Sequence, residues 1–105
     1  MRKFNQNRGF GVEIELLANQ SRSMVARAIT RAGVNCHSES YNHRTTNYWK
    51  IVTDSSIVYS SGYGHTMEIV SPILRGLNGL HQLNTVLQVL NNTEGLKVKV
   101  NKSCG

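Results

Sequence analysis

Residues 9–17, GFGVEIELL, alternate between apolar and other side chains with a period of two. This period is that of a β-strand, in which successive side chains point to opposite faces. One face of the predicted strand is apolar, and the other carries Glu13 and Glu15. Two carboxylates about 7 Å apart on one face repel each other unless a cation or a basic side chain lies between them. The pattern therefore predicts either a water-exposed sheet face, which is the commoner case, or a cation site.

Two further segments have the apolar periodicity of amphipathic helices. In residues 19–33, Ser21 or Ser23 is the expected N-cap and Gly33 the expected left-handed stop. The second helical segment covers residues 76–95 and is expected to end at Gly95. Five other segments read as strands: 34–41, 48–54, 55–61, 66–72 and 96–100. This order, β-α-β-β-β-β-α-β, predicts an α+β domain with a mostly antiparallel sheet and two helices on one face.

The length of 105 residues suits one small domain covering residues 1–105. The chain has no apolar run near the roughly 20 residues that span a bilayer, and no apolar stretch follows its basic start. We therefore expect a soluble, cytoplasmic protein with no membrane partner. Cys36 and Cys104 match no zinc pattern and are expected to be free thiols, with a bridge between them as the less favoured alternative.

The net charge of +6, from twelve basic and six acidic residues, favours polyanionic partners. The basic residues are dispersed along the chain and form no block. Direct nucleic-acid binding through a basic surface is therefore one alternative. It ranks last because the helix-turn-helix, zinc and aromatic-sheet signatures of such proteins are absent from the sequence.

Four of the six acids lie in or at the end of predicted strands, where acids are ordinarily depleted. They are Glu13, Glu15, Asp54 and Glu68. If Glu68 lies on a strand that neighbours Glu13 and Glu15, three carboxylates share one face. Oxygen ligands of this kind suit Mg²⁺ or Mn²⁺ holding nucleotide phosphates. The sequence contains no Walker A motif, no G-x-G-x-x-G and no nucleophile elbow.

Five motifs follow one another along the chain: GFGVEIEL, WKIVTDSSI, MEIVSPIL, GL..L..VL..L and KVNKSCG. Together they resemble the amidoligase family, which is related to the carboxylate–amine ligases glutamine synthetase and glutamate–cysteine ligase. The resemblance runs from about Phe10 to Gly105. It implies that Glu13, Glu15 and Glu68 bind the Mg²⁺ that carries ATP, and that Asp54 with Ser55 or Ser56 binds the amine substrate. The implied reaction is attack of a carboxylate on the γ-phosphate, followed by capture of the acyl-phosphate by an amine.

Family members continue beyond the glycine that corresponds to Gly105, into a histidine and arginines that hold phosphate. The resemblance therefore implies a truncated, glutamine-synthetase-like half domain with little or no ligase activity as a lone chain. The expected function is a catalytically incomplete domain that binds a protein or nucleoprotein partner, for example as a phage-type inhibitor of a host defence complex. The alternative is an ATP- and Mg²⁺-dependent ligase that another subunit completes, including a second copy in a homo-oligomer.

Overall fold

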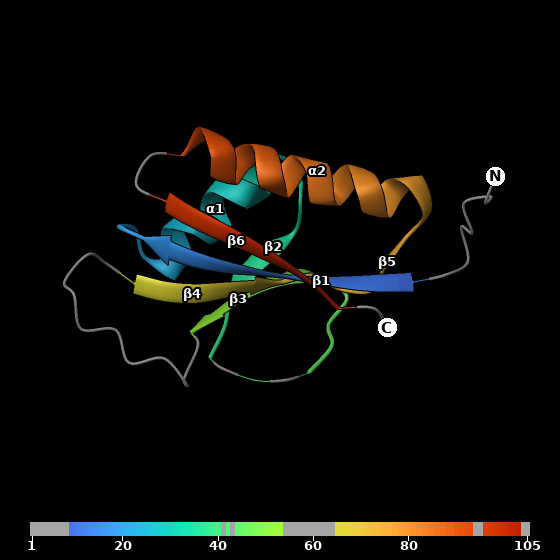
Figure 1. Ribbon diagram of the computed structural model, residues 1–105, viewed down its shortest axis with the longest axis horizontal. Coiled ribbons are helices and arrows are strands. Elements are labelled where there is room, and N and C mark those ends of the chain that lie inside the picture. Colours follow the sequence, from blue (N-terminus) through green and yellow to red (C-terminus); the bar gives the residue numbers. More distant parts are fainter. Residues whose placement is uncertain (1–8, 41, 43, 54–64, 94–95, 104–105) are drawn as a thin grey trace.

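The computed structural model describes residues 9–40, 42, 44–53, 65–93 and 96–103 (Figure 1). The elements are, in chain order, β1 (Gly9–Ala18), α1 (Arg22–Arg31), β2 (Cys36–Ser38), β3 (Trp49–Thr53), β4 (His65–Val70), β5 (Leu74–Arg75), α2 (Gly76–Asn92) and β6 (Leu96–Ser103). The predicted strand at 55–61 lies outside the described residues, and the short strand β5 was not predicted. The other predicted strands and helices are present in the structure, with ends that differ from the predicted ones, as is usual for element boundaries.

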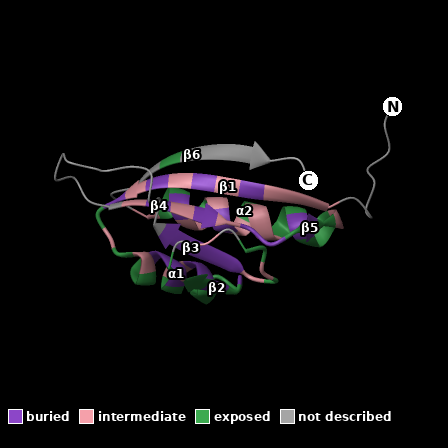
Figure 2. Ribbon diagram, turned by 90° about the horizontal axis from the view of Figure 1, so that it is seen from below, coloured by how far each residue is buried: buried purple, intermediate pink, exposed green. Residues whose placement is uncertain are grey.

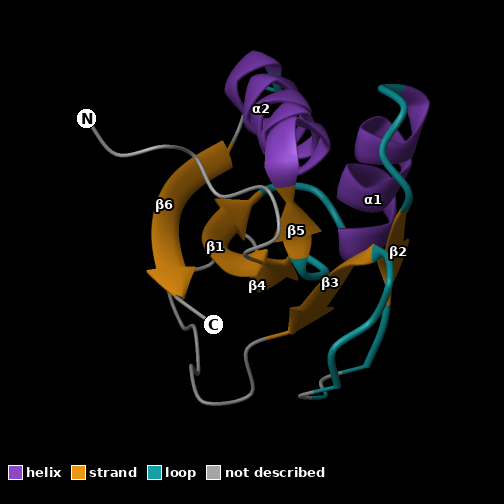
Figure 3. Ribbon diagram, turned by 90° about the vertical axis from the view of Figure 1, so that its right-hand side faces the viewer, coloured by secondary structure: helices purple, strands orange, loops and turns teal. Residues whose placement is uncertain are grey.

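The sheet has the strand order β2-β3-β4-β1, and β6 pairs with the other edge of β1. All pairs are antiparallel except β2 with β3, which is parallel. Both helices lie on the same side of this sheet, with α1 beside β2 and β3 and α2 over β1 and β5 (Figure 3). The predicted α+β class, with a mostly antiparallel sheet and two helices on one face, is confirmed.

The core fills the space between the helices and the sheet. Along β1, buried and half-buried residues alternate, as the bands in Figure 2 show. Apolar residues of β1, β3 and β4 face the helices and form one cluster with α1 and α2; its central members include Ile14, Ile29, Trp49, Ile51, Met67, Ile69, Val86 and Leu90. Trp49 also donates a hydrogen bond from Nε1 to Oε1 of Gln82, 3.0 Å away, which ties β3 to α2. Of the helices in the described part of the chain, none has the length and apolar character needed to cross a membrane.

The ends of α1 follow the signals in the sequence. The Ser21 hydroxyl accepts a hydrogen bond from the backbone N–H of Met24 at 3.3 Å, so Ser21 is the N-cap. Gly33 has a φ of 105°, and the next residue, Val34, donates its N–H to the carbonyl of Ile29 at 3.3 Å. This is a Schellman ending, and both Val34 and Ile29 belong to the buried core. Helix α2 ends at Asn92, before the predicted stop at Gly95, and Gly95 itself lies outside the described residues.

A bulge joins β4 to β5 along one edge of β1. Glu13 pairs with Val70 and Phe10 with Leu74, so three steps along β1 match four steps along the other strand. At the extra residue, Ser71 donates its N–H to the Val12 carbonyl at 3.0 Å, and its hydroxyl accepts from the Val12 N–H at 2.9 Å. The hydroxyl in turn donates to the Pro72 carbonyl at 2.7 Å. A side chain thus supplies the acceptor that a regular strand would provide from its backbone.

Candidate functional site

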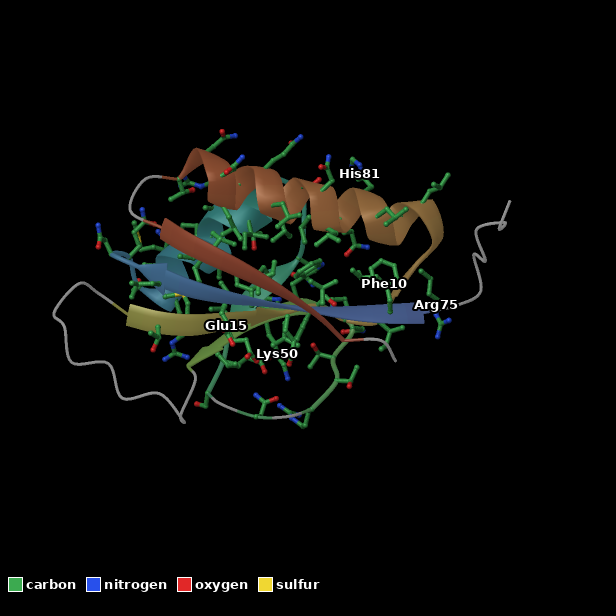
Figure 4. All side chains as sticks on the ribbon, viewed as in Figure 1. Phe10, Glu15, Lys50, Arg75 and His81 are labelled. Atoms are coloured by element: carbon green, nitrogen blue, oxygen red, sulfur yellow. The ribbon has the colours of Figure 1, made fainter. Side chains whose placement is uncertain are left out.

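Three glutamates share the sheet face that points away from the helices, called the outer face from here on. On β1, Glu13 and Glu15 are half-buried, whereas their neighbours on the other face are buried in the core. On β4, Glu68 has the same relation to buried Met67 and Ile69. Figure 4 shows Glu15 on the side of the sheet opposite α2. The structure therefore brings Glu13, Glu15 and Glu68 to one face, because β4 pairs with β1, the condition on which the expected grouping depended.

The register fixes the spacing of these glutamates. Glu15 is directly opposite Glu68, and Glu13 is opposite Val70. Directly opposed residues of an antiparallel pair have Cβ atoms about 4.5–5.5 Å apart, and diagonal neighbours about 7–8 Å apart. Glu15 and Glu68 are thus adjacent, with Glu13 one diagonal away from Glu68. On the other edge of β1, the backbone register places Lys99 opposite Glu15.

The donor chemistry of this face fits a magnesium ion, although the side chains do not converge on one point. Within the described ranges, no group of three or more His, Cys, Asp or Glu residues is gathered closely enough to hold a metal. Mg²⁺, however, is usually bound by one or two carboxylates, with waters and substrate phosphates completing its coordination. The adjacent pair Glu15 and Glu68 can supply that donor set.

Lys50, on β3, is a member of the outer face that the sequence interpretation missed. It pairs with Val70, and Val52 of the same strand pairs with Glu68, so both belong to the glutamate face. Val52 is buried but stands outside the core cluster, which agrees with this placement. The Lys50 side chain is only 1% exposed, and Figure 4 shows it on the same side of the sheet as Glu15. The signal was present, since a lysine interrupts the apolar strand WKIV at an outward position.

The described residues 39–40, 42 and 44–48, called the strap here, include the groups that contact the Lys50 ammonium. The Lys50 ammonium donates to Oδ1 of Asn42 at 2.6 Å and to the backbone carbonyl of Arg44. Asn42 also donates from Nδ2 to Oε1 of Glu39 at 3.2 Å, and the Tyr48 hydroxyl donates to the other Glu39 oxygen. The two Lys50 contacts join the strap to β3, and the contacts of Glu39 link strap residues to one another.

Hydrogen bonding also changes the acid–base properties of the strap. The Tyr48 hydroxyl is the main cause that holds the pKa of Glu39 below its ordinary value, with Asn42, Arg44 and Lys50 adding to the effect. The same hydrogen bond raises the pKa of Tyr48. Glu39, which was not among the predicted site residues, is therefore held as a carboxylate beside the buried lysine.

The remaining predicted site residues differ in what can be said of them. Asp54, Ser55 and Ser56 lie outside the described residues. Trp49, which precedes Asp54 in the motif, is a core residue bonded to α2. Cys36 is a buried free thiol, as predicted, and Cys104 lies outside the described residues.

A mostly antiparallel sheet with helices on one face and carboxylates on the other defines a domain that can present an acidic surface to a cationic or metal-bound ligand. The chain belongs to the amidoligase family: residues 6–105 match the family model described as "Putative amidoligase enzyme". No curated protein and no solved structure gave a match.

Proposed function

We propose that the outer face binds ATP through Mg²⁺ and forms the acidic part of a carboxylate–amine ligase site. The observation that carries this proposal is the direct opposition of Glu15 and Glu68, with Glu13 on the same face. Membership of the amidoligase family supports it, because ATP-dependent amide formation requires a site that neutralises phosphate charge.

Electrostatics supports the same reading. Like charges placed directly opposite each other destabilise a sheet, and here both partners are half-buried. A divalent cation between the two carboxylates replaces their repulsion by attraction to a shared ion.

Each residue has a defined part in the proposed site. Glu15 and Glu68 would hold the ion, and Glu13 would serve as a further oxygen donor to the ion or its waters. The bound ion would neutralise phosphate charge during attack by the substrate carboxylate. From the family motif, Asp54 and Ser56 are proposed to bind and orient the amine.

Calorimetric titration of ATP, with Mg²⁺ and with EDTA, tests the proposal. We expect binding that requires Mg²⁺ and is lost in Glu15→Gln and in Glu68→Gln. Glu94→Gln is the matched control, because it removes the same charge from the sequence between α2 and β6. Equal affinity in all four proteins, or binding that persists in EDTA, would show that these glutamates hold no metal–nucleotide.

The other roles predicted from the sequence remain predictions. These are inhibition of a protein or nucleoprotein complex, completion of the site by another subunit, and nucleic-acid binding through the basic surface. The family match supports an amidoligase-like domain and adds nothing to these roles. Copurification of the tagged protein with a defined partner tests the first role, and sedimentation tests self-association.

A further inference from the structure

We propose that Lys50 is a phosphate-binding residue of the outer face, and that its ammonium contacts the polyphosphate of the nucleotide held at Glu15 and Glu68. This inference rests on the proposed function and adds to it a cationic group from within the same sheet. Lys50 would bind the phosphate on the side away from the metal ion.

The first argument is position. Lys50 and Glu68 occupy neighbouring strands, offset by two residues, because Val52 is the residue directly opposite Glu68. Such diagonal neighbours lie about 7–8 Å apart. At that spacing of the two residues, their long side chains can reach one phosphoryl group, with one of its oxygens on Mg²⁺ and another accepting a hydrogen bond from the ammonium.

The second argument is charge. Lys50 is 1% exposed, and a buried ammonium is costly unless it is paired with an opposite charge. Its two described hydrogen bonds go to neutral acceptors, the Asn42 amide and the Arg44 carbonyl, while the Glu39 carboxylate of the same segment attracts it electrostatically. An ammonium has three donors, and a hydrogen bond from it to an ionised oxygen gains the attraction between opposite charges as well. A phosphate oxygen would therefore be a better partner than either acceptor in the strap.

The third argument concerns the cover over Lys50. Both neutral acceptors belong to the strap, in which the described residues form no helix or strand between Ser38 and Trp49. Exchange of a strap acceptor for a phosphate oxygen therefore breaks no backbone ladder of the sheet. Asn42 and Lys50 are thus expected to have opposite effects on phosphate binding, since Asn42 competes with the ligand for the ammonium.

Two titrations test this role: Mn²⁺ alone, followed by electron paramagnetic resonance, and Mg²⁺–ATP, followed by calorimetry. Lys50→Met should weaken Mg²⁺–ATP binding about ten- to hundred-fold, the range of one hydrogen bond to a charged group. It should leave Mn²⁺ binding equal or tighter, because a nearby positive charge is removed. Asn42→Ala should bind Mg²⁺–ATP at least as tightly as the wild type. Arg27→Met, at an exposed position of α1, is the charge-matched control and should change neither titration.

The outcomes separate this inference from the proposed function. Absence of Mn²⁺ binding in the wild type refutes the proposed metal site itself. Normal Mn²⁺ binding with unchanged ATP affinity in Lys50→Met overturns only the role of Lys50. Equal weakening in Lys50→Met and Asn42→Ala also overturns it, because both changes would then act by loosening the strap. If circular dichroism shows that Lys50→Met does not fold, Lys50→Gln, which keeps a polar group beneath the strap, takes its place in the same titrations.

Discussion

Replacement of Ser71 by alanine should destabilise the domain strongly for so small a change. Ser71 is 7% exposed, and its hydroxyl is the acceptor for the Val12 N–H at 2.9 Å within the bulge. Alanine would leave this buried donor without its partner, which costs about 1–3 kcal/mol. For a domain of about 100 residues, a loss of about 2 kcal/mol lowers the melting temperature by roughly 8–16 °C. The effect should reach the site as well, because Val12 directly precedes Glu13.

Urea unfolding followed by the fluorescence of the single tryptophan, which is buried in the core, measures this loss. Ser23→Ala, at an exposed position, is the matched control and should stay within about 0.5 kcal/mol of the wild type. A free energy of unfolding for Ser71→Ala that also lies within about 0.5 kcal/mol would refute the reasoning. It would mean that the Val12 N–H finds another acceptor and that the hydroxyl does not maintain the bulge.

Three further predictions concern the strap and the core. The hydrogen bond from Tyr48 holds the pKa of Glu39 below its ordinary value, so the pair adds stability at neutral pH that is lost as the pH falls through the lowered pKa. Urea unfolding at neutral and acid pH should therefore show a smaller pH dependence in Tyr48→Phe than in the wild type, and an equal dependence would count against the pair. Burial raises the pKa of Cys36 to about 12, so a thiol reagent should modify Cys36 only on unfolding, and rapid modification of the native protein would contradict its burial. Gly79→Ala should lower the free energy of unfolding by about 1–3 kcal/mol, since a Cβ there would lie 2.8 Å from Cβ of Leu74. A melting temperature equal to that of the wild type would show that α2 and β5 can move apart at little cost.

Much of the fold could be predicted because each local signal was strong. The alternation in β1 fixed which residues face the core, and Ser21 and Gly33 marked the ends of α1 as expected. Strand β5 was missed because two residues are too few to show a period. Its pairing also depends on the bulge at Ser71, which is a tertiary feature.

The site could be predicted only in part. Glu13, Glu15 and Glu68 were expected to meet if their strands were neighbours, and the pairing of β1 with β4 confirms that condition. The place of Lys50 on the outer face could be read from the strand pattern, but its burial could not, because that comes from hydrogen bonds with the strap and not from any periodic pattern. Glu39 was missed for the same reason.

The central claim is that a divalent cation binds between Glu15 and Glu68. Amide NMR spectra of the protein titrated with Mn²⁺ test it most directly, because the paramagnetic ion broadens the resonances of nearby residues. The account predicts broadening that is strongest at Glu15 and Glu68, weak in α1 on the opposite side of the sheet, and reversed by excess Mg²⁺. Amide resonances that do not broaden during the titration, or broadening centred away from β1 and β4, would contradict it.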